Sequence, residues 1–136
     1  MKPEIDSALK TWHRMVKSKD VALLQEIIHP DAVFRSPMAH SPYKGGMALG
    51  MALSTVLNVF EDFVYHREFV SDDGLNVTLE FSAVVNGKHL KGVDLIRFDE
   101  DGKVREFEVM IRPMSGLAAL GEEMGKRIGA QIKEFR

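Results

Sequence analysis

The chain contains no cysteine, no long uncharged apolar run and no marked excess of either charge. Without cysteine there is no disulfide, no thiol nucleophile and no thiolate metal ligand. No apolar run approaches the ~18 residues of a membrane span, and the first residues lack the core of a signal peptide. The 18 basic and 20 acidic side chains nearly cancel, which provides no electrostatic footprint for nucleic acid or an anionic membrane. We therefore expect a cytoplasmic protein with neither a nucleic-acid nor a membrane partner.

Motifs for metals, phosphates and serine hydrolysis are missing as well. The five histidines form no pair with convincing metal-ligand spacing. Gly45-Gly46 lacks the rest of any phosphate-binding motif, and Ser36 has no Gly-x-Ser-x-Gly context. We expect no metal and no cofactor.

The 136 residues suffice for one domain with a single core and are too few for two. The first half carries helical signals. Apolar residues recur at helical spacing from about residue 3 to residue 17. Asp20 is a suitable N-cap for a short helix over 21–28, which His29-Pro30 would end. A short strand over 32–35, a loop rich in proline and glycine over 36–46, and a helix over 47–60 follow.

The second half is typical of a β-meander. Asp73-Gly74, Asn86-Gly87 and Asp101-Gly102 are turn signals at regular intervals. They separate four predicted strands at 63–71, 75–85, 88–98 and 103–112. Strands of this length twist and curl, and the upstream helices must cover their concave side. The sequence thus predicts a single α+β domain over 1–136. Its core, about 3–113, is a cone-shaped curved antiparallel sheet wrapped around N-terminal helices.

Asp94 is an acid in the middle of an apolar strand. Counted by twos, it shares a face with Leu90, Ile96 and Phe98. A carboxyl on that face must be paired, hydrogen-bonded or neutral, because burial of a bare ion is too costly. Two interpretations fit equally well. Asp94 is either a working acid in a pocket or a structural acid held by a histidine, an arginine or a backbone amide.

Several segments together resemble the nuclear transport factor 2-like superfamily, with the SnoaL-like and ketosteroid isomerase-like branches the most similar. The resemblance rests on Lys19-Asp20, on His29-Pro30-Asp31-Ala32-Val33-Phe34, on the loop rich in proline and glycine, and on Asp101-Gly102-Lys103-Val104. It implies a cystatin-like cone that encloses an apolar pocket and commonly dimerises through the outer face of its sheet. We therefore expect a homodimer that binds a hydrophobic small molecule.

The resemblance also implies particular site residues. Val93-Asp94-Leu95-Ile96-Arg97-Phe98 matches the segment that carries the protonated aspartic acid of ketosteroid isomerases. The general-base aspartate of those enzymes would fall at Ser36, which is no carboxylate. Their oxyanion tyrosine would fall near Trp12, whose indole is no comparable acid. With two of the three catalytic groups missing, steroid isomerisation itself is not expected.

We expect a hydrophobic, carbonyl-containing ligand and proton-transfer chemistry such as isomerisation, cyclisation or dehydration. Asp94 would be the acid or oxyanion donor, and His40, on the loop over the pocket mouth, would be the base. The predicted ligand-binding residues are Trp12, Val16, Phe34, Ser36, Met51, Phe81, Ile96, Val109 and Ile111. Two alternatives stay open: a non-catalytic binding protein, and an interaction or dimerisation module that uses an exposed apolar sheet face.

The C-terminal segment predicts an added helix over about 115–135. Gly121, Gly125 and Gly129 run along its flank four residues apart, although each glycine costs a helix about 1 kcal/mol relative to alanine. The segment would be either a weak, fraying tail or a helix that packs against a partner subunit or closes the pocket mouth.

Overall fold

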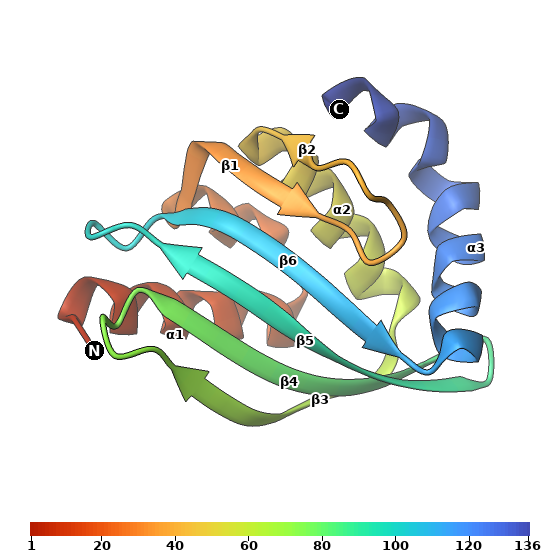
Figure 1. Ribbon diagram of the computed structural model, residues 1–136, viewed down its shortest axis with the longest axis horizontal. Helices are drawn as coiled ribbons and strands as arrows, with labels where there is room; N and C mark the ends of the chain where they lie inside the picture. Colours follow the sequence, from red (N-terminus) through yellow and green to blue (C-terminus); the bar gives the residue numbers. More distant parts are fainter.

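The computed structural model describes all residues from 1 to 136 as one α+β unit (Figure 1). The elements are α1 (Pro3–Ser18), a 3-10 helix η1 (Val21–Glu26), β1 (Ile28–Arg35), β2 (Tyr43–Lys44), α2 (Gly46–Val59), β3 (Glu61–Val70), β4 (Asn76–Val85), β5 (Lys88–Phe98), β6 (Val104–Arg112), α3 (Met114–Ile132) and a final 3-10 turn η2 (Lys133–Phe135). None of the helices is long and apolar enough to cross a membrane.

Six strands form one curved mixed sheet in the order β2-β1-β6-β5-β4-β3. The meander β3 to β6 is antiparallel, as the sequence predicts, and Asn86-Gly87 forms a two-residue turn with positive φ at both positions. β1 pairs parallel to β6, and the two-residue β2 pairs with β1 at the edge. The sheet is therefore larger than the predicted four strands plus one short strand.

The segment after α1 differs from the sequence prediction. Residues 21–26 form a 3-10 helix rather than an α-helix, and the Asp20 side chain makes no capping hydrogen bond. His29 and Pro30 belong to β1, which begins at Ile28. The reason lies in tertiary structure. As a strand, β1 forms backbone hydrogen bonds with β6, and a longer helix in this segment would lose them.

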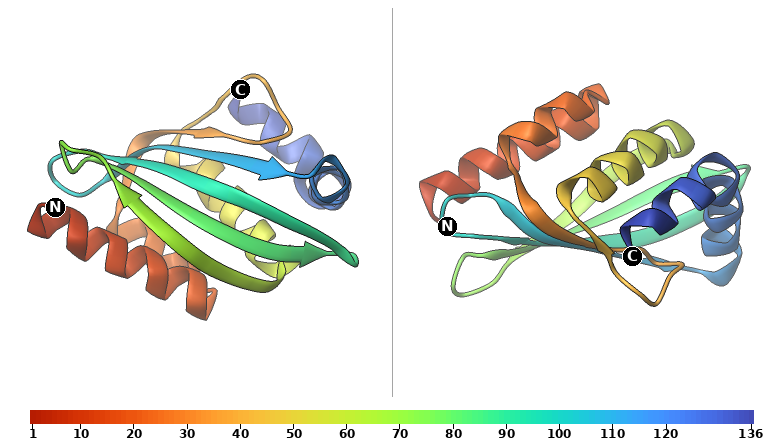
Figure 2. Two further views of the ribbon diagram at one scale, coloured as in Figure 1. Left: turned by 60° about the horizontal axis from the view of Figure 1, so that its bottom comes forward. Right: turned by 90° about the horizontal axis from the view of Figure 1, so that it is seen from above.

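The helices lie on one side of the sheet (Figure 2). α1 begins with Pro3, has Glu4 and Asp6 in its first turn, and buries one face that includes Ile5 and Trp12. α2 packs beside β1, and α3 packs against α2 and the ends of β4, β5 and β6. A Cβ at Gly116 would lie 2.7 Å from the Leu90 Cβ, so the first turn of α3 sits directly on β5.

The core divides between two regions of the concave face. A larger cluster joins α1, α2 and the β1 side of the sheet, and includes Trp12, Phe34, Ile96 and Phe107. A smaller cluster joins Phe81 and its neighbours to the first half of α3. The space between the sheet, α2 and α3 is only partly filled, and the site lies there.

Candidate functional site

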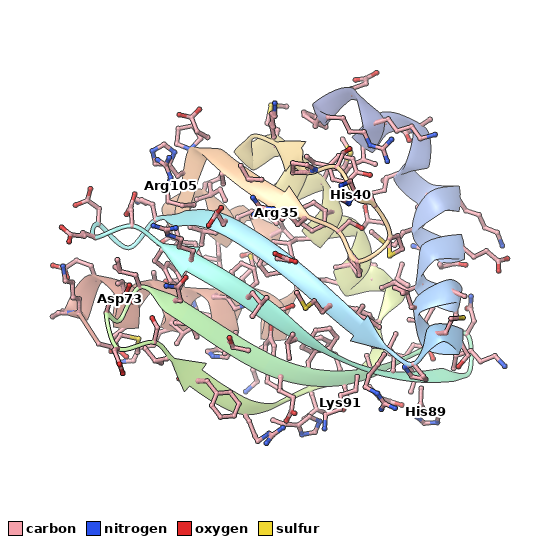
Figure 3. All side chains as sticks on the ribbon, in the orientation of Figure 1. Arg35, His40, Asp73, His89, Lys91 and Arg105 are labelled. Carbon is pink, nitrogen blue, oxygen red and sulfur yellow. The ribbon has the colours of Figure 1, made fainter.

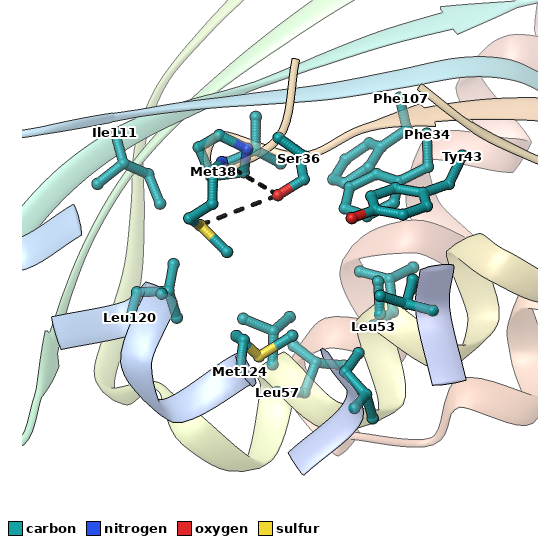
Figure 4. Close-up of a pocket in the computed structure, with 18 of the residues that line it drawn as sticks. Phe34, Ser36, Met38, Tyr43, Leu53, Leu57, Phe107, Ile111, Leu120 and Met124 are labelled. Atoms are coloured by element: carbon teal, nitrogen blue, oxygen red, sulfur yellow. Dashed lines mark hydrogen bonds between the residues drawn. The ribbon is translucent and has the colours of Figure 1, made fainter. Parts of the chain in front are cut away.

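An apolar cavity of about 230 Å³ lies between the concave face of the sheet, α2, α3 and the loop that joins β1 to β2. Figure 4 shows Ser36 and Met38 of that loop on one side of the cavity and Leu120 and Met124 of α3 on the other. The volume is more than tenfold the ~10–15 Å³ that a single water requires. The cavity can therefore hold a small organic molecule, and its mainly hydrophobic lining favours an apolar one.

Asp94 forms part of the cavity wall at the end of a hydrogen-bonded chain. The Tyr65 hydroxyl donates to Asp94 Oδ2 at 2.6 Å, and Trp12 Nε1 donates to the Tyr65 hydroxyl at 3.1 Å. β5, β3 and α1 each supply one of these three residues. The indole N–H and the hydroxyl both donate in the direction of the Asp94 carboxyl, and this arrangement stabilises the ionised form of the carboxyl.

Burial opposes that stabilisation and outweighs it. The Asp94 side chain lies in the concave face, and the residue is only 6% exposed. Desolvation raises the pKa of Asp94 from 3.8 to about 7, and the Tyr65 hydrogen bond lowers the pKa by a smaller amount. Burial and the neighbouring carboxyl raise the pKa of Tyr65 well above its usual value of 10. Near pH 7, Asp94 is thus poised to accept or release a proton while Tyr65 stays protonated.

The surroundings of Asp94 favour one of the two interpretations of its burial. Asp94 forms no salt bridge, and it is the only carboxylic acid in the cavity lining. Its partner is a neutral hydroxyl rather than a histidine, an arginine or a backbone amide. The arrangement is that of a tunable acid beside a cavity, since an acid kept for an ion pair would face a cation.

Most of the predicted ligand-binding residues lie around this cavity. The lining includes Trp12, Val16, Phe34, Ser36, Phe81, Asp94, Val109 and Ile111. Ile96 instead packs in the core on the same face, and Met51 is a partly buried α2 residue packed against that core. Whether the lining residues bind a ligand stays a prediction.

His40 does not join the cavity. It is an exposed residue of the loop between β1 and β2, as Figure 3 shows, and it is absent from the lining. No histidine lines the cavity, and Asp94 is the only carboxylic acid there. The loop lies over the cavity as expected, but it contributes Ser36, Pro37, Met38 and Ala39 rather than His40.

Sequence reasoning missed Tyr65, the residue that contacts Asp94 directly. Tyr65 on β3 pairs with Phe81 on β4, and Asp94 on β5 pairs with Leu79, which lies two positions before Phe81 on β4. β3 also shifts register between Tyr65 and Glu68. Its alternation with Phe63 is a signal that could have indicated the inner face, but the contact with Asp94 depends on the curvature of the sheet and on this register shift.

α3 contributes a wall of the cavity and places its three spaced glycines in the lining. Gly121, Gly125 and Gly129 all line the cavity. A Cβ at Gly125 or Gly129 would meet no atom within 4 Å, and one at Gly121 would meet only Met38 at 3.1 Å. The glycine flank therefore leaves open space beside the cavity lining, and Gly125 is also exposed to solvent.

A second hollow of about 420 Å³ lies between the end of α1, the end of α2 and the start of β3. It shares Tyr65 with the main cavity but is lined partly by polar residues, namely His13, Lys17, Lys19 and Asp62. His13 packs edge-on against Tyr65, with ring centroids 5.3 Å apart. This hollow is more polar and does not include Asp94.

Comparisons with known proteins agree with this architecture. The family model of the SnoaL-like domain matches residues 9–107. A crystal structure described as a steroid delta-isomerase from Pseudomonas aeruginosa is 53% identical, with a TM-score of 0.92 over 98% of this chain and 97% of that one. A protein with a cystatin-like fold from Silicibacter pomeroyi is 29% identical, with a TM-score of 0.82 over 92% of this chain and 93% of that one.

A putative SnoaL-like polyketide cyclase from Jannaschia sp. shares the fold at 14% identity, with a TM-score of 0.69 over 88% of this chain and 95% of that one. A comparison with curated proteins finds no match. The match over most of the chain, together with the concave sheet and its cavity, shows that the chain belongs to the SnoaL-like domain family of the nuclear transport factor 2-like superfamily, a fold that binds small molecules.

Proposed function

We propose that the protein binds an apolar, carbonyl-containing small molecule in its cavity and transfers a proton next to the carbonyl group. One observation carries the proposal: a buried carboxyl, Asp94, is hydrogen-bonded to Tyr65 in the wall of an apolar cavity and faces no cation. A carboxyl whose pKa lies near neutrality is suited to remove a proton and to return it.

The step needs only one carboxyl group. With a β,γ-unsaturated ketone, Asp94 takes a proton from the carbon between the carbonyl and the C=C bond, and the electron pair of that C–H bond moves into a dienolate. The carboxylic acid then returns the proton to a different carbon, which shifts the double bond and restores the ionised Asp94. Exclusion of water by the apolar lining strengthens the electrostatic interactions in this step.

The Pseudomonas aeruginosa relative, described as a steroid delta-isomerase, supports isomerisation of a ketosteroid-like substrate. The arrangement proposed here differs from the one that the ketosteroid isomerase resemblance implies, because Ser36 supplies no carboxylate base. Asp94, as the only carboxylic acid in the lining, would take the role of the base.

A non-catalytic binding protein is the second proposal. It is favoured by the absence of a second carboxyl and of any histidine from the cavity lining. Such a protein would hold the carbonyl group by a hydrogen bond from neutral Asp94 and would leave the bound molecule unchanged.

The test uses androst-5-ene-3,17-dione, whose isomerisation to the conjugated enone is visible in the ultraviolet. Trp12 is the only tryptophan and lies in the cavity wall, so its fluorescence reports occupancy. Binding with turnover that falls at least a hundredfold in Asp94→Asn, and not in the exposed control Asp72→Asn, would support the enzyme. Binding without turnover would support the binding protein, and no binding would contradict both proposals for this ligand class.

A homodimer through the outer face of the sheet is a further part of the proposal. Val64 and Met110 are about half exposed there (50% and 51%), and Val93 and Leu95 lie half-buried between them. An apolar patch on the outer face of a sheet favours burial against a second copy.

A further inference from the structure

The open end of the cavity carries two cations that have no acidic partner. Lys133 and Arg136, both in the last four residues, line the otherwise apolar cavity. Neither forms a salt bridge, and the neighbouring Glu134 is exposed and lies outside the lining. The charged residues of the preceding helix α3 are instead paired within the helix, as Lys126 is with Glu122 and Arg127 with Glu123.

Arg136 is held in place by an aromatic ring rather than by a charge. Its guanidinium lies over the Tyr43 ring at 5.4 Å, and its Nη2 donates to the Tyr43 hydroxyl at 3.3 Å. Tyr43 is itself buried, so the ring is a fixed platform. A planar guanidinium placed in this way keeps donors free for a carboxylate.

A row of rings connects this cationic end with the Asp94 end. Tyr43 stacks on Phe34 at 5.8 Å, Phe34 on Phe107 at 6.0 Å, and Phe107 lies 5.0 Å from Trp12. Trp12 donates to Tyr65, which donates to Asp94. Figure 4 shows Tyr43, Phe34 and Phe107 together on one wall of the cavity. The wall thus runs from a proton-transfer group to a pair of cations.

The opposite wall favours a ligand that is long rather than compact. Gly121, Gly125 and Gly129 face the cavity over two turns of α3, and the last two leave open space where side chains would stand. Because these glycines have no side chains, a path stays open along α3 toward Lys133 and Arg136.

We infer that the natural ligand is an elongated apolar keto acid, with its carbonyl group beside Asp94 and its carboxylate between Lys133 and Arg136. This inference rests on the proposed binding function and names the class of ligand. An apolar body fits the aromatic wall and the glycine flank, and an anionic end satisfies two cations that the protein leaves unpaired.

The test compares 3-oxochol-4-en-24-oic acid with its methyl ester, which have the same ring system and differ in the charge of the side chain. Binding is followed by Trp12 fluorescence at low and high salt. We expect the acid to bind about tenfold more tightly than the ester at low salt, with a smaller ratio at high salt because the cations are exposed. In the double variant K133Q/R136Q the ratio of acid to ester affinity falls to about one.

Lys126→Gln is the matched control, because it removes a cation of the adjoining helix α3 that lies outside the cavity lining; we expect it to leave the ratio unchanged. Equal binding of acid and ester to the natural protein would overturn the inference and uphold the binding function. A ratio that persists in K133Q/R136Q would overturn the role of these cations. Failure of both compounds to bind would overturn the inference together with the proposed function for this ligand class.

Discussion

At the scale of single residues, Asp94 and Tyr65 form a hydrogen-bonded pair of titratable groups in the cavity wall. A carboxyl in an apolar wall is costly to ionise, and a single short hydrogen bond from Tyr65 offsets only part of that cost. Asp94 therefore gains or loses its proton near neutral pH, and this proton decides whether the pair is charged. Two substitutions separate the contribution of burial from that of the hydrogen bond.

Asp94→Asn should remove a pH dependence of stability. The pKa of Asp94 rises from 3.8 to about 7 on folding, so the unfolded chain loses this proton first and stability falls as pH rises from about 4 to about 7. At ~1.4 kcal/mol per pKa unit the loss is on the order of 4 kcal/mol. We expect Asp94→Asn to match the natural protein near pH 4 and to exceed it in unfolding free energy at pH 8.

Urea denaturation at pH 4, 6 and 8 measures the effect, with the exposed Asp72→Asn as the control. A difference between Asp94→Asn and the natural protein that stays constant across this range would contradict a raised pKa for Asp94.

Tyr65→Phe should raise the pKa of Asp94 further, because the hydrogen bond that favours the ionised form disappears. It also leaves Trp12 Nε1 without its acceptor, so we expect a loss of about 1–3 kcal/mol in unfolding free energy. Carboxyl NMR titration of Asp94 measures the first effect. Tyr43→Phe, which removes a hydroxyl at the other end of the cavity, should leave that titration unchanged.

At the scale of elements, α3 closes the cavity and sets its shape. Its first turn is fixed on β5 by the close approach at Gly116, and its glycine flank leaves space further along. The loop between β1 and β2 faces α3 across the cavity (Figure 4). The helix therefore acts as part of the site as well as part of the fold.

Gly125→Leu should fill cavity space without a clash, because a Cβ at this position meets no atom within 4 Å. Replacing a helical glycine gains up to about 1 kcal/mol, so the variant should be at least as stable as the natural protein. Its affinity for androst-5-ene-3,17-dione should fall at least tenfold, as measured by Trp12 fluorescence. Ala118→Leu, on an exposed part of α3 outside the lining, is the control and should keep full affinity.

At the scale of the whole molecule, the two faces of the sheet have different roles. The concave face holds the core and the cavity, whereas the outer face combines an apolar patch with an ion-pair network in which Arg67 and Lys91 contact Glu80. This network holds the pKa of Glu80 at about 2 and keeps a mostly buried carboxylate charged. The remaining apolar side chains make the outer face suitable for a second copy.

Met110→Glu should dissociate the proposed homodimer, because it would place a carboxylate in the apolar patch beside Val93. Light scattering after size exclusion would then give one chain mass for the variant and two for the natural protein. Met47→Glu, the same substitution at a residue of α2 that is 78% exposed, should leave the mass unchanged. A natural protein that is monomeric at micromolar concentration would contradict the homodimer.

The sequence by itself determined the α+β class, the four meander strands and the inward position of Asp94. These follow from local rules, namely turn signals with positive φ and strict alternation in long strands. The length of these strands also predicted the curvature of the sheet, and the resemblance added the apolar pocket and some of the residues that line it. The C-terminal helix followed from its apolar period.

Only the tertiary structure decided which distant residues meet. The parallel pairing of β1 with β6 replaced the predicted helix end at His29-Pro30, since backbone pairing outweighs weak local preference. Tyr65 reached Asp94 through the curvature of the sheet, while His40 stayed outside the cavity although its loop lies over it. The side of the cavity on which Lys133 and Arg136 lie was likewise set by packing between α3, α2 and the sheet. Such contacts depend on the summed geometry of several elements, which no local pattern in the chain encodes.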